Sequence, residues 1–136
     1  DKILKYEPVL QQVSDDSGLT LSQIKGLIDH ETAGTWNEKI NPPGGSDSGL
    51  CQHTKATQDD IIKKFGKYNV FDGVQNLKMT AKWLNYLKTI PNVKTFDDLL
   101  KAYHYGQTAA RNNRKDFIND PDGYVKKVKD SISKFE

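Results

Sequence analysis

The sequence predicts an all-α fold in a single domain, and three observations support this prediction. The chain has 136 residues, which is the length of one domain that can bury about two-thirds of its unfolded surface. Apolar residues recur at spacings of three and four along most of the chain, and no convincing strand pattern interrupts them. Two Trp, six Tyr and five Phe supply large side chains for a core, although the mean hydropathy is −0.74. We therefore treat residues 1–136 as one domain of short helices.

The first half of the chain predicts two amphipathic helices followed by a long loop. Apolar residues between positions 3 and 13 form the opening helix, and Pro8 marks its start or a kink. A capping box at Thr20 begins the second helix, which should stop at Gly34. Residues 34–49 are rich in Gly, Pro, Asn and Ser, which is loop chemistry that leaves room for a small irregular hairpin. A loop of this length inside a compact domain is usually functional or disordered.

The second half predicts four further helices, each between a capping residue and a residue that interrupts helices. The second of them, which follows Asp72, has the strongest apolar stripe of the chain. After the third of them comes a polar stretch rich in Arg and Asn. The predicted limits are Thr57 with Asp60 to Gly66, Asp72 to Pro91, Thr95 with Asp98 to Gly106, and Asp120-Pro121 onward.

Charge and composition exclude several classes of function. Lys and Arg total 20 while Asp and Glu total 18, a net charge of +2 that gives no electrostatic reason to expect a nucleic-acid partner. No apolar run approaches the roughly 18–20 residues that a membrane span needs. The single cysteine, Cys51, provides neither an internal disulfide nor a cysteine zinc finger. The chain starts at Asp1 without a signal-peptide pattern, so we expect a mature product or a domain of a larger protein. We also expect this domain to be monomeric.

Glu31 is the strongest candidate for chemistry on physical grounds. It follows Leu27 and Ile28 by four and three residues, so it lies on the apolar face of the second helix. A carboxyl group at the end of a buried face should be partly desolvated, and desolvation raises its pKa toward the range that a general acid needs. An exposed glutamate at a helix end is the alternative that position alone leaves open.

Four short blocks, taken in order, resemble a known family. They are Glu31-Thr32, then Gly49-Leu50-Cys51-Gln52 with Thr57, then Ala102-Tyr103-His104-Tyr105-Gly106, then Tyr124-Val125. Each block alone is weak, because Gln52 is otherwise a loop residue and both Tyr103 and Tyr124 are otherwise core aromatics. Together the blocks resemble the soluble lytic transglycosylase (SLT) family, which is related to goose-type lysozymes. The resemblance covers the chain from the second helix to the last.

The resemblance implies a lysozyme-like α-domain around a substrate cleft. Such a domain cleaves the β-1,4 bond between MurNAc and GlcNAc in the glycan strands of peptidoglycan, and it needs no cofactor or metal. The glutamate of the first block, here Glu31, is the family's catalytic acid and base. The resemblance implies substrate contacts for Thr32, Gln52, Tyr103, His104 and Tyr124. The family's third block normally reads Ala-Tyr-Asn-Ala-Gly, so His104 and Tyr105 depart from it and put the usual amide contact in doubt. Cys51 stands where the family has Met, at a position expected to be buried.

Two reaction types remain open at this point. A transglycosylase uses one carboxyl group to protonate the glycosidic oxygen and then to deprotonate the MurNAc 6-hydroxyl, which closes a 1,6-anhydro ring without water. A hydrolytic lysozyme needs a second carboxylate to position water. Asp47 is the candidate for that role, because goose-type lysozymes place an aspartate near this block. Asp47 could equally well only shape the loop turn.

Other function classes were weighed against the same residues. His30-Glu31 begins like a zinc-peptidase helix, but the second histidine would have to stand at position 34, which is Gly34. A glycan-binding module without turnover stays open because of His104 and Tyr105, although a binder has no need for a desolvated acid. Peptidoglycan lies outside the cytoplasm, so we expect an extracytoplasmic setting, in the cell envelope or in a phage virion with bacteriolytic activity.

Overall fold

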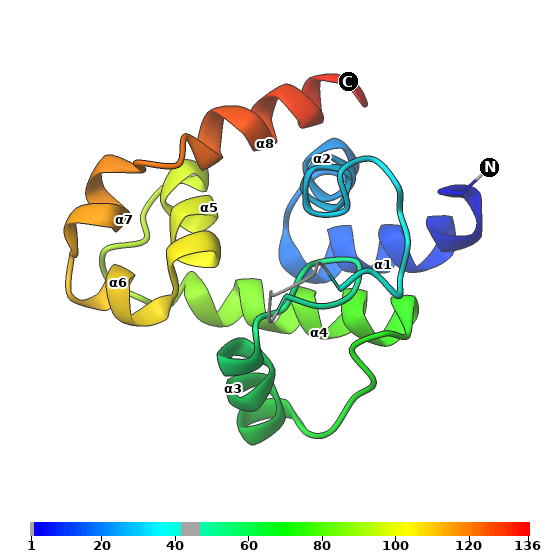
Figure 1. The fold of residues 1–136 in the computed structure, drawn as a ribbon, viewed down its shortest axis with the longest axis horizontal. Helices are drawn as coiled ribbons and strands as arrows, with labels where there is room; N and C mark the ends of the chain where they lie inside the picture. Colours follow the sequence, from blue (N-terminus) through cyan, green and yellow to red (C-terminus); the bar gives the residue numbers. More distant parts are fainter. Residues whose placement is uncertain (1, 42–46) are drawn as a thin grey trace.

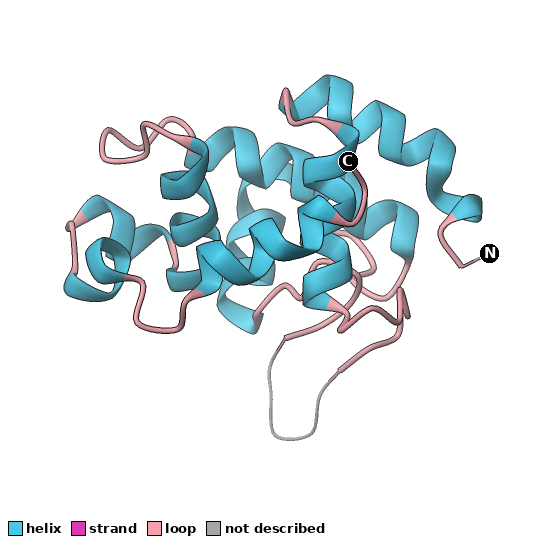
Figure 2. Cartoon of the chain, turned by 90° about the horizontal axis from the view of Figure 1, so that it is seen from above, coloured by secondary structure: helices cyan, strands magenta, loops and turns pink. Residues whose placement is uncertain are grey.

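The computed structural model describes residues 2–41 and 47–136, and these parts are helical without a strand (Figure 2). The all-α prediction is confirmed. Where a small hairpin was predicted, the described residues form one antiparallel bridge, between Ser48 and His53. Residues 42–46 of the predicted loop lie outside the described part. The helices, in order, are the 3-10 helix η1 Leu4–Tyr6, α1 Glu7–Ser17, α2 Leu21–Glu31, α3 Lys55–Phe65, α4 Gly73–Leu87, α5 Phe96–Tyr105, α6 Gln107–Arg111, α7 Lys115–Asn119 and α8 Tyr124–Ser133.

The helices pack around α4, which lies along α1 and meets α5 near its end (Figure 1). The C-terminal helix α8 crosses over α2 and α5, so it joins the two halves of the chain. A Cβ on Gly26 would lie 2.3 Å from the Ile132 side chain, and the contact between α2 and α8 therefore depends on this glycine. A small apolar cluster beneath α8 holds the three helices together: Leu27, Leu100, Tyr124, Val128 and Ile132. This crossing places the end of α2 beside the start of α8.

Two helix starts differ from the prediction because other residues cap them. The α3 helix begins at Lys55, since the Thr54 hydroxyl accepts from the backbone N–H of Thr57 at 3.1 Å. The prediction that Thr57 and Asp60 cap this helix was wrong by one turn. The α8 helix begins at Tyr124 after a left-handed Gly123, so Asp120 and Pro121 precede the helix rather than begin it.

Other boundaries show where tertiary contacts outweigh local signals. The α4 helix ends at Leu87, before Pro91, and two single-turn helices, α6 and α7, occupy the polar stretch for which no helix was predicted. Both short helices bury apolar residues, Ala109 and Ala110 in α6 and Phe117 in α7. Their sequences are too short and polar to show a helical period, so packing determines them.

Candidate functional site

The carboxyl group of Glu31 lies at the C-terminal end of α2, half-buried between α2 and α8. Leu27 and Ile28, on the same face, are at most 1% exposed, as the apolar stripe predicted. Burial raises the pKa of Glu31 to about 7. A hydrogen bond from the Tyr124 hydroxyl to Oε2 acts in the opposite direction, and the negative charge of Asp47 raises the pKa further. Glu31 therefore has the protonation behaviour of a general acid near neutral pH.

Tyr124 is held on three sides at the first turn of α8. Its ring stacks on His104, with the centroids 4.2 Å apart and the planes 9° from parallel. The His30 ring meets it edge-on at 5.3 Å. The backbone N–H of Tyr124 donates to Asp120 Oδ1 at 2.9 Å. With 2% of its surface exposed, Tyr124 offers Glu31 a hydroxyl whose position is fixed.

The turn that contains Gly49 and Cys51 is attached to two helices. Gly49 has φ +80°, and a Cβ there would lie 2.3 Å from the Val70 carbonyl oxygen, so the turn requires glycine. The backbone N–H of Cys51 donates to Asn76 Oδ1 in α4 at 3.1 Å, and the Tyr103 hydroxyl in α5 donates to the Cys51 carbonyl. Cys51 is buried, as expected for an apolar replacement of Met, and burial raises the pKa of its thiol to about 12. The thiol is therefore not a nucleophile at neutral pH.

Thr32 and Gln52 support the backbone around the site. The Thr32 hydroxyl is fully buried, where it donates to the Ile28 carbonyl at 2.8 Å and accepts from the N–H of Trp36 at 3.0 Å. Gln52 is 9% exposed, and its Nε2 donates to the Gly49 carbonyl at 2.9 Å. The structure therefore gives Thr32 no surface for a sugar and uses the amide nitrogen of Gln52 within the turn.

A cavity of about 260 Å³ adjoins this centre on the side of α5. Tyr103 and His104 connect the cavity to the residues around Glu31, because both line the cavity. His104 also stacks on Tyr124, and the Tyr103 hydroxyl also donates to the Cys51 carbonyl. The cavity has hydroxyl, carboxylate and aromatic groups in its wall, which suits a sugar ring. Its lining residues are Thr54, Ala56, Thr57, Asp60, Trp83, Tyr103, His104, Tyr105, Gly106, Gln107 and Thr108.

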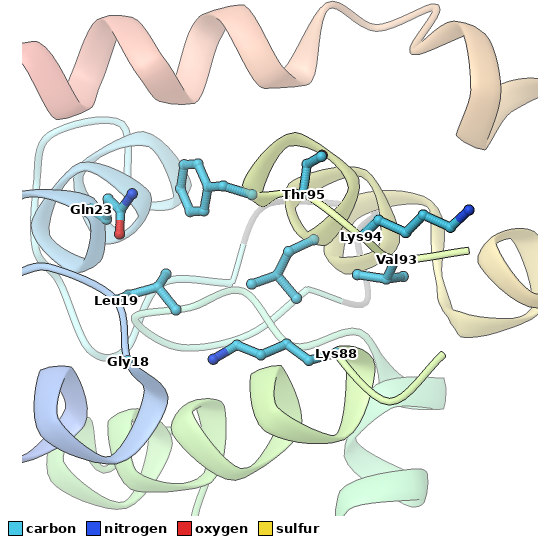
Figure 3. A pocket seen from close by; sticks show the side chains of 9 residues that line it. Gly18, Leu19, Gln23, Lys88, Val93, Lys94 and Thr95 are labelled. Carbon is cyan, nitrogen blue, oxygen red and sulfur yellow. The ribbon is translucent and has the colours of Figure 1, made fainter. Parts of the chain in front are cut away.

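A larger cavity of about 420 Å³ lies elsewhere, between the α1–α2 turn and the start of α5 (Figure 3). Its wall includes Gly18, Leu19 and Thr95 and none of the predicted site residues. The ammonium group of Lys88 at its edge already donates to the Ser17 carbonyl. Its volume exceeds that of the cavity beside Tyr103, but the predicted site residues and most of the aromatic groups lie at the smaller cavity.

Asp120 and Asp122 are residues of the site region that the sequence patterns did not single out. Asp120 accepts from the backbone N–H groups of Tyr124 and Val125 and from the Tyr105 hydroxyl. Asp122 Oδ2 lies 2.8 Å from His104 Nε2. An aspartate before proline was interpreted as a helix start, and the pairing with residues about 15 positions earlier has no local signal.

No group of three His, Cys, Asp or Glu side chains within residues 2–41 and 47–136 is arranged to hold a metal ion. None of the helices in the same ranges is both long and apolar enough to cross a membrane.

Comparison with known proteins identifies the family. No curated protein matches the chain. The family model of the transglycosylase SLT domain matches residues 9–122, which include Glu31 and Tyr103 and end just before Tyr124. The resemblance of the four sequence blocks is thereby confirmed at the level of the family. The chain belongs to the transglycosylase SLT domain family, whose members are peptidoglycan glycosidases of the lytic transglycosylase type.

Proposed function

We propose that this chain is a lytic transglycosylase that cleaves the β-1,4 bond between MurNAc and GlcNAc and forms 1,6-anhydro-MurNAc. The observation that carries this proposal is the half-buried Glu31 carboxyl group, whose pKa is raised to about 7 by burial and which accepts a hydrogen bond from Tyr124. A single carboxyl group that can hold a proton near neutral pH, and release it, suits a reaction that uses one group first as acid and then as base.

In the first step, protonated Glu31 donates its proton to the glycosidic oxygen. The bond from that oxygen to C1 of MurNAc breaks, GlcNAc leaves with a new 4-hydroxyl, and positive charge develops at C1. The acetamido group of the same MurNAc stabilises that charge. Because the Tyr124 hydroxyl donates to Glu31, it also stabilises the carboxylate that the proton transfer creates.

In the second step, the Glu31 carboxylate accepts the proton of the MurNAc 6-hydroxyl, and O6 attacks C1. The 1,6-anhydro ring forms, and Glu31 is again protonated for the next cycle. We propose that the glycan strand passes from Glu31 into the cavity lined by Tyr103 and His104. Water is not a reactant in this reaction, and no cofactor is required.

A hydrolytic reaction is the second candidate, and one observation favours it. The charge of Asp47 contributes to the raised pKa of Glu31, so the two carboxyl groups are close enough to interact. A second carboxylate in that position could activate water on the face of the sugar opposite the acid. Only the product distinguishes this reaction from the transglycosylase reaction.

The experiment that tests the proposal is mass spectrometry of purified peptidoglycan digested by the protein, with Glu31→Gln as the inactive control. Anhydro-MurNAc ends, one water lighter than reducing ends, should dominate, and Asp47→Asn should keep substantial activity. Reducing MurNAc as the main product, together with an inactive Asp47→Asn, would instead assign hydrolysis. If peptidoglycan stays intact after exposure to the folded wild-type protein, the protein is a glycan-binding module without turnover.

The family acts on peptidoglycan, so the site of action lies outside the cytoplasm. We propose that the chain works as a monomeric domain of a larger envelope or phage virion protein, where it opens the wall. Sedimentation of the isolated chain tests the monomeric state.

A further inference from the structure

The two residues that depart from the family's third block both contact the segment that precedes Tyr124. His104 Nε2 lies 2.8 Å from Asp122 Oδ2. The Tyr105 hydroxyl donates to Asp120 Oδ1 at 2.6 Å. We call these four residues the α5–α8 clamp, because they connect the last turn of α5 to the turn that starts α8.

The aspartates of the α5–α8 clamp also hold the first turn of α8. Asp120 accepts from the backbone N–H of Tyr124 at 2.9 Å and from that of Val125 at 3.0 Å. Partial burial acts to raise the pKa of Asp120, but the Tyr105 hydrogen bond and these two amides outweigh it and hold the pKa below its usual value. The backbone N–H of Asp122 donates back to the Tyr105 hydroxyl at 3.0 Å. An ionised Asp120 therefore fixes where α8, and with it Tyr124, begins.

His104 acts on the side chain of Tyr124 as well. The parallel stack at 4.2 Å covers one face of the phenol ring, and the contact of Nε2 with Asp122 Oδ2 at 2.8 Å restrains the imidazole. Since the Tyr124 hydroxyl donates to Glu31, a rotation of the phenol would move the donor away from the carboxyl group.

We propose that His104 and Tyr105 are positioning residues, which act through Asp122, Asp120 and Tyr124 to hold the Tyr124 hydroxyl on Glu31. This inference rests on the proposed role of Glu31 and gives His104, which also lines the proposed glycan cavity, a second role through contacts inside the protein. The titratable and charged groups around His104 and Tyr124 that enter any pH measurement include Asp120, Asp122, Tyr105, Tyr103, Cys51, His30, Lys127 and Glu31.

The test measures the pKa of Glu31 directly, by carbon NMR of protein labelled with ¹³C-glutamate, of which the chain has four residues. The Tyr124 hydrogen bond lowers the pKa of Glu31, so its loss should move the titration midpoint of Glu31 to higher pH. We expect His104→Ala and Tyr105→Phe to move the midpoint in the same direction as Tyr124→Phe. In the background of Tyr124→Phe, neither change should move it further.

Kinetics supply the second readout. His104→Ala should lower kcat about tenfold, which is less than the full contribution of acid–base catalysis, and should change KM by a smaller factor. The matched control is Arg114→Ala, which breaks the exposed pair of Arg114 and Asp116 and should change neither the midpoint nor kcat. Tyr105→Phe removes a single hydroxyl, so it keeps the test open if His104→Ala does not fold.

An unchanged Glu31 midpoint in both single variants overturns the inference, and so does a raised KM at constant kcat, which would make His104 a substrate contact. Shifts that add to that of Tyr124→Phe also overturn it. The NMR titration does not depend on turnover, so it can succeed even if Glu31→Gln proves active and the proposed function fails. The two failures are therefore distinguishable.

Discussion

Burial shifts the pKa of two groups in opposite directions: Glu31, half-buried in the site, and His53, fully buried in the core. His53 is 1% exposed, and both ring nitrogens have partners: Nδ1 accepts from the Tyr68 hydroxyl at 2.7 Å, and Nε2 lies 2.8 Å from Thr80 Oγ1. Thr80 donates its own proton to the Asn76 carbonyl, so Nε2 of His53 carries the hydrogen. Burial lowers the pKa of His53 to about 3, while burial raises that of Glu31 to about 7.

Glu31 and His53 differ in whether another interaction opposes the pKa shift that burial causes. Nothing favours the charged form of His53, so its pKa moves far from neutrality and the ring stays neutral. The Tyr124 hydroxyl does favour the charged form of Glu31, so the pKa of this carboxyl stops near the pH at which an enzyme works. A buried group without an opposing interaction keeps one protonation state at neutral pH. A buried carboxyl group that also accepts a hydrogen bond can keep a pKa near neutrality, so it can both donate and accept a proton.

The largest expected effect is on the activity of Glu31→Gln. The amide keeps the shape and the contact with Tyr124 but has no proton to donate at neutral pH. Cell-wall clearing should fall by about 10²–10⁴-fold, which is the usual contribution of general acid catalysis. A folded variant, checked by circular dichroism, that clears cell walls like wild type would remove Glu31 from the mechanism.

His53 should affect stability at low pH instead. Below pH 6.5 the unfolded ring takes up a proton that the folded ring refuses, so wild type loses stability as the pH falls, by roughly 3 kcal/mol at pH 4. His53→Phe should cost about 1–3 kcal/mol at pH 7 through lost hydrogen bonds, and this deficit should disappear by pH 4. Urea unfolding at both pH values measures it.

The matched control is Tyr68→Phe, which removes one partner of His53 and keeps the ring. The loss in free energy of unfolding caused by Tyr68→Phe should be the same at pH 4 as at pH 7. If His53→Phe behaves in the same way as Tyr68→Phe at both pH values, His53 is not held neutral by burial, and the comparison with Glu31 fails.

Glu31 should show the opposite pH dependence of stability. Between pH 4.5 and about 7, the folded protein keeps a proton on Glu31 that the unfolded chain releases, so this group loses its stabilising contribution as the pH rises. At pH 8 the buried carboxylate should cost roughly 2–3 kcal/mol, because each pKa unit corresponds to about 1.4 kcal/mol and Glu31 is partly exposed. Glu31→Gln should therefore unfold at a higher temperature than wild type at pH 8 and at nearly the same temperature at pH 4. A lower Tm at pH 8 would contradict the raised pKa.

Most helices and the position of Glu31 were predictable because their signals are local. The capping residues Thr20, Asp72 and Thr95 each accept from the backbone N–H three residues later, as their sequence patterns indicate. The position of Glu31 on a buried face followed from its spacing to Leu27 and Ile28. Such signals involve residues within one or two helical turns.

The supporting contacts were not predictable because they join distant segments. Thr32 was expected to touch substrate, and only the folded chain places the backbone N–H of Trp36 against its hydroxyl. His104 was judged only as a departure from the family pattern, since its partner Asp122 is 18 residues away. The match to the family ends at residue 122, so the prediction for Tyr124 rests on the fourth sequence block and on its hydrogen bond to Glu31.

The smallest expected effect separates the two tyrosines of the site. Tyr124 donates to the carboxyl group of Glu31, whereas Tyr103 donates to the backbone carbonyl of Cys51. Tyr124→Phe should lower turnover at least about tenfold with a Tm near that of wild type, because the lost hydrogen bond stabilises an ionised group during the reaction. Its loss also raises the pKa of Glu31, so the fall of activity at alkaline pH should move to higher pH.

Tyr103→Phe leaves a buried carbonyl without its donor, so it should lower stability by about 1–3 kcal/mol and change turnover less. Turnover at several pH values and thermal unfolding of both variants measure these effects. If the two variants lose turnover equally and keep the same pH profile as wild type, the hydroxyl of Tyr124 has no special relation to Glu31, and no donor opposes the effect of burial on this carboxyl group.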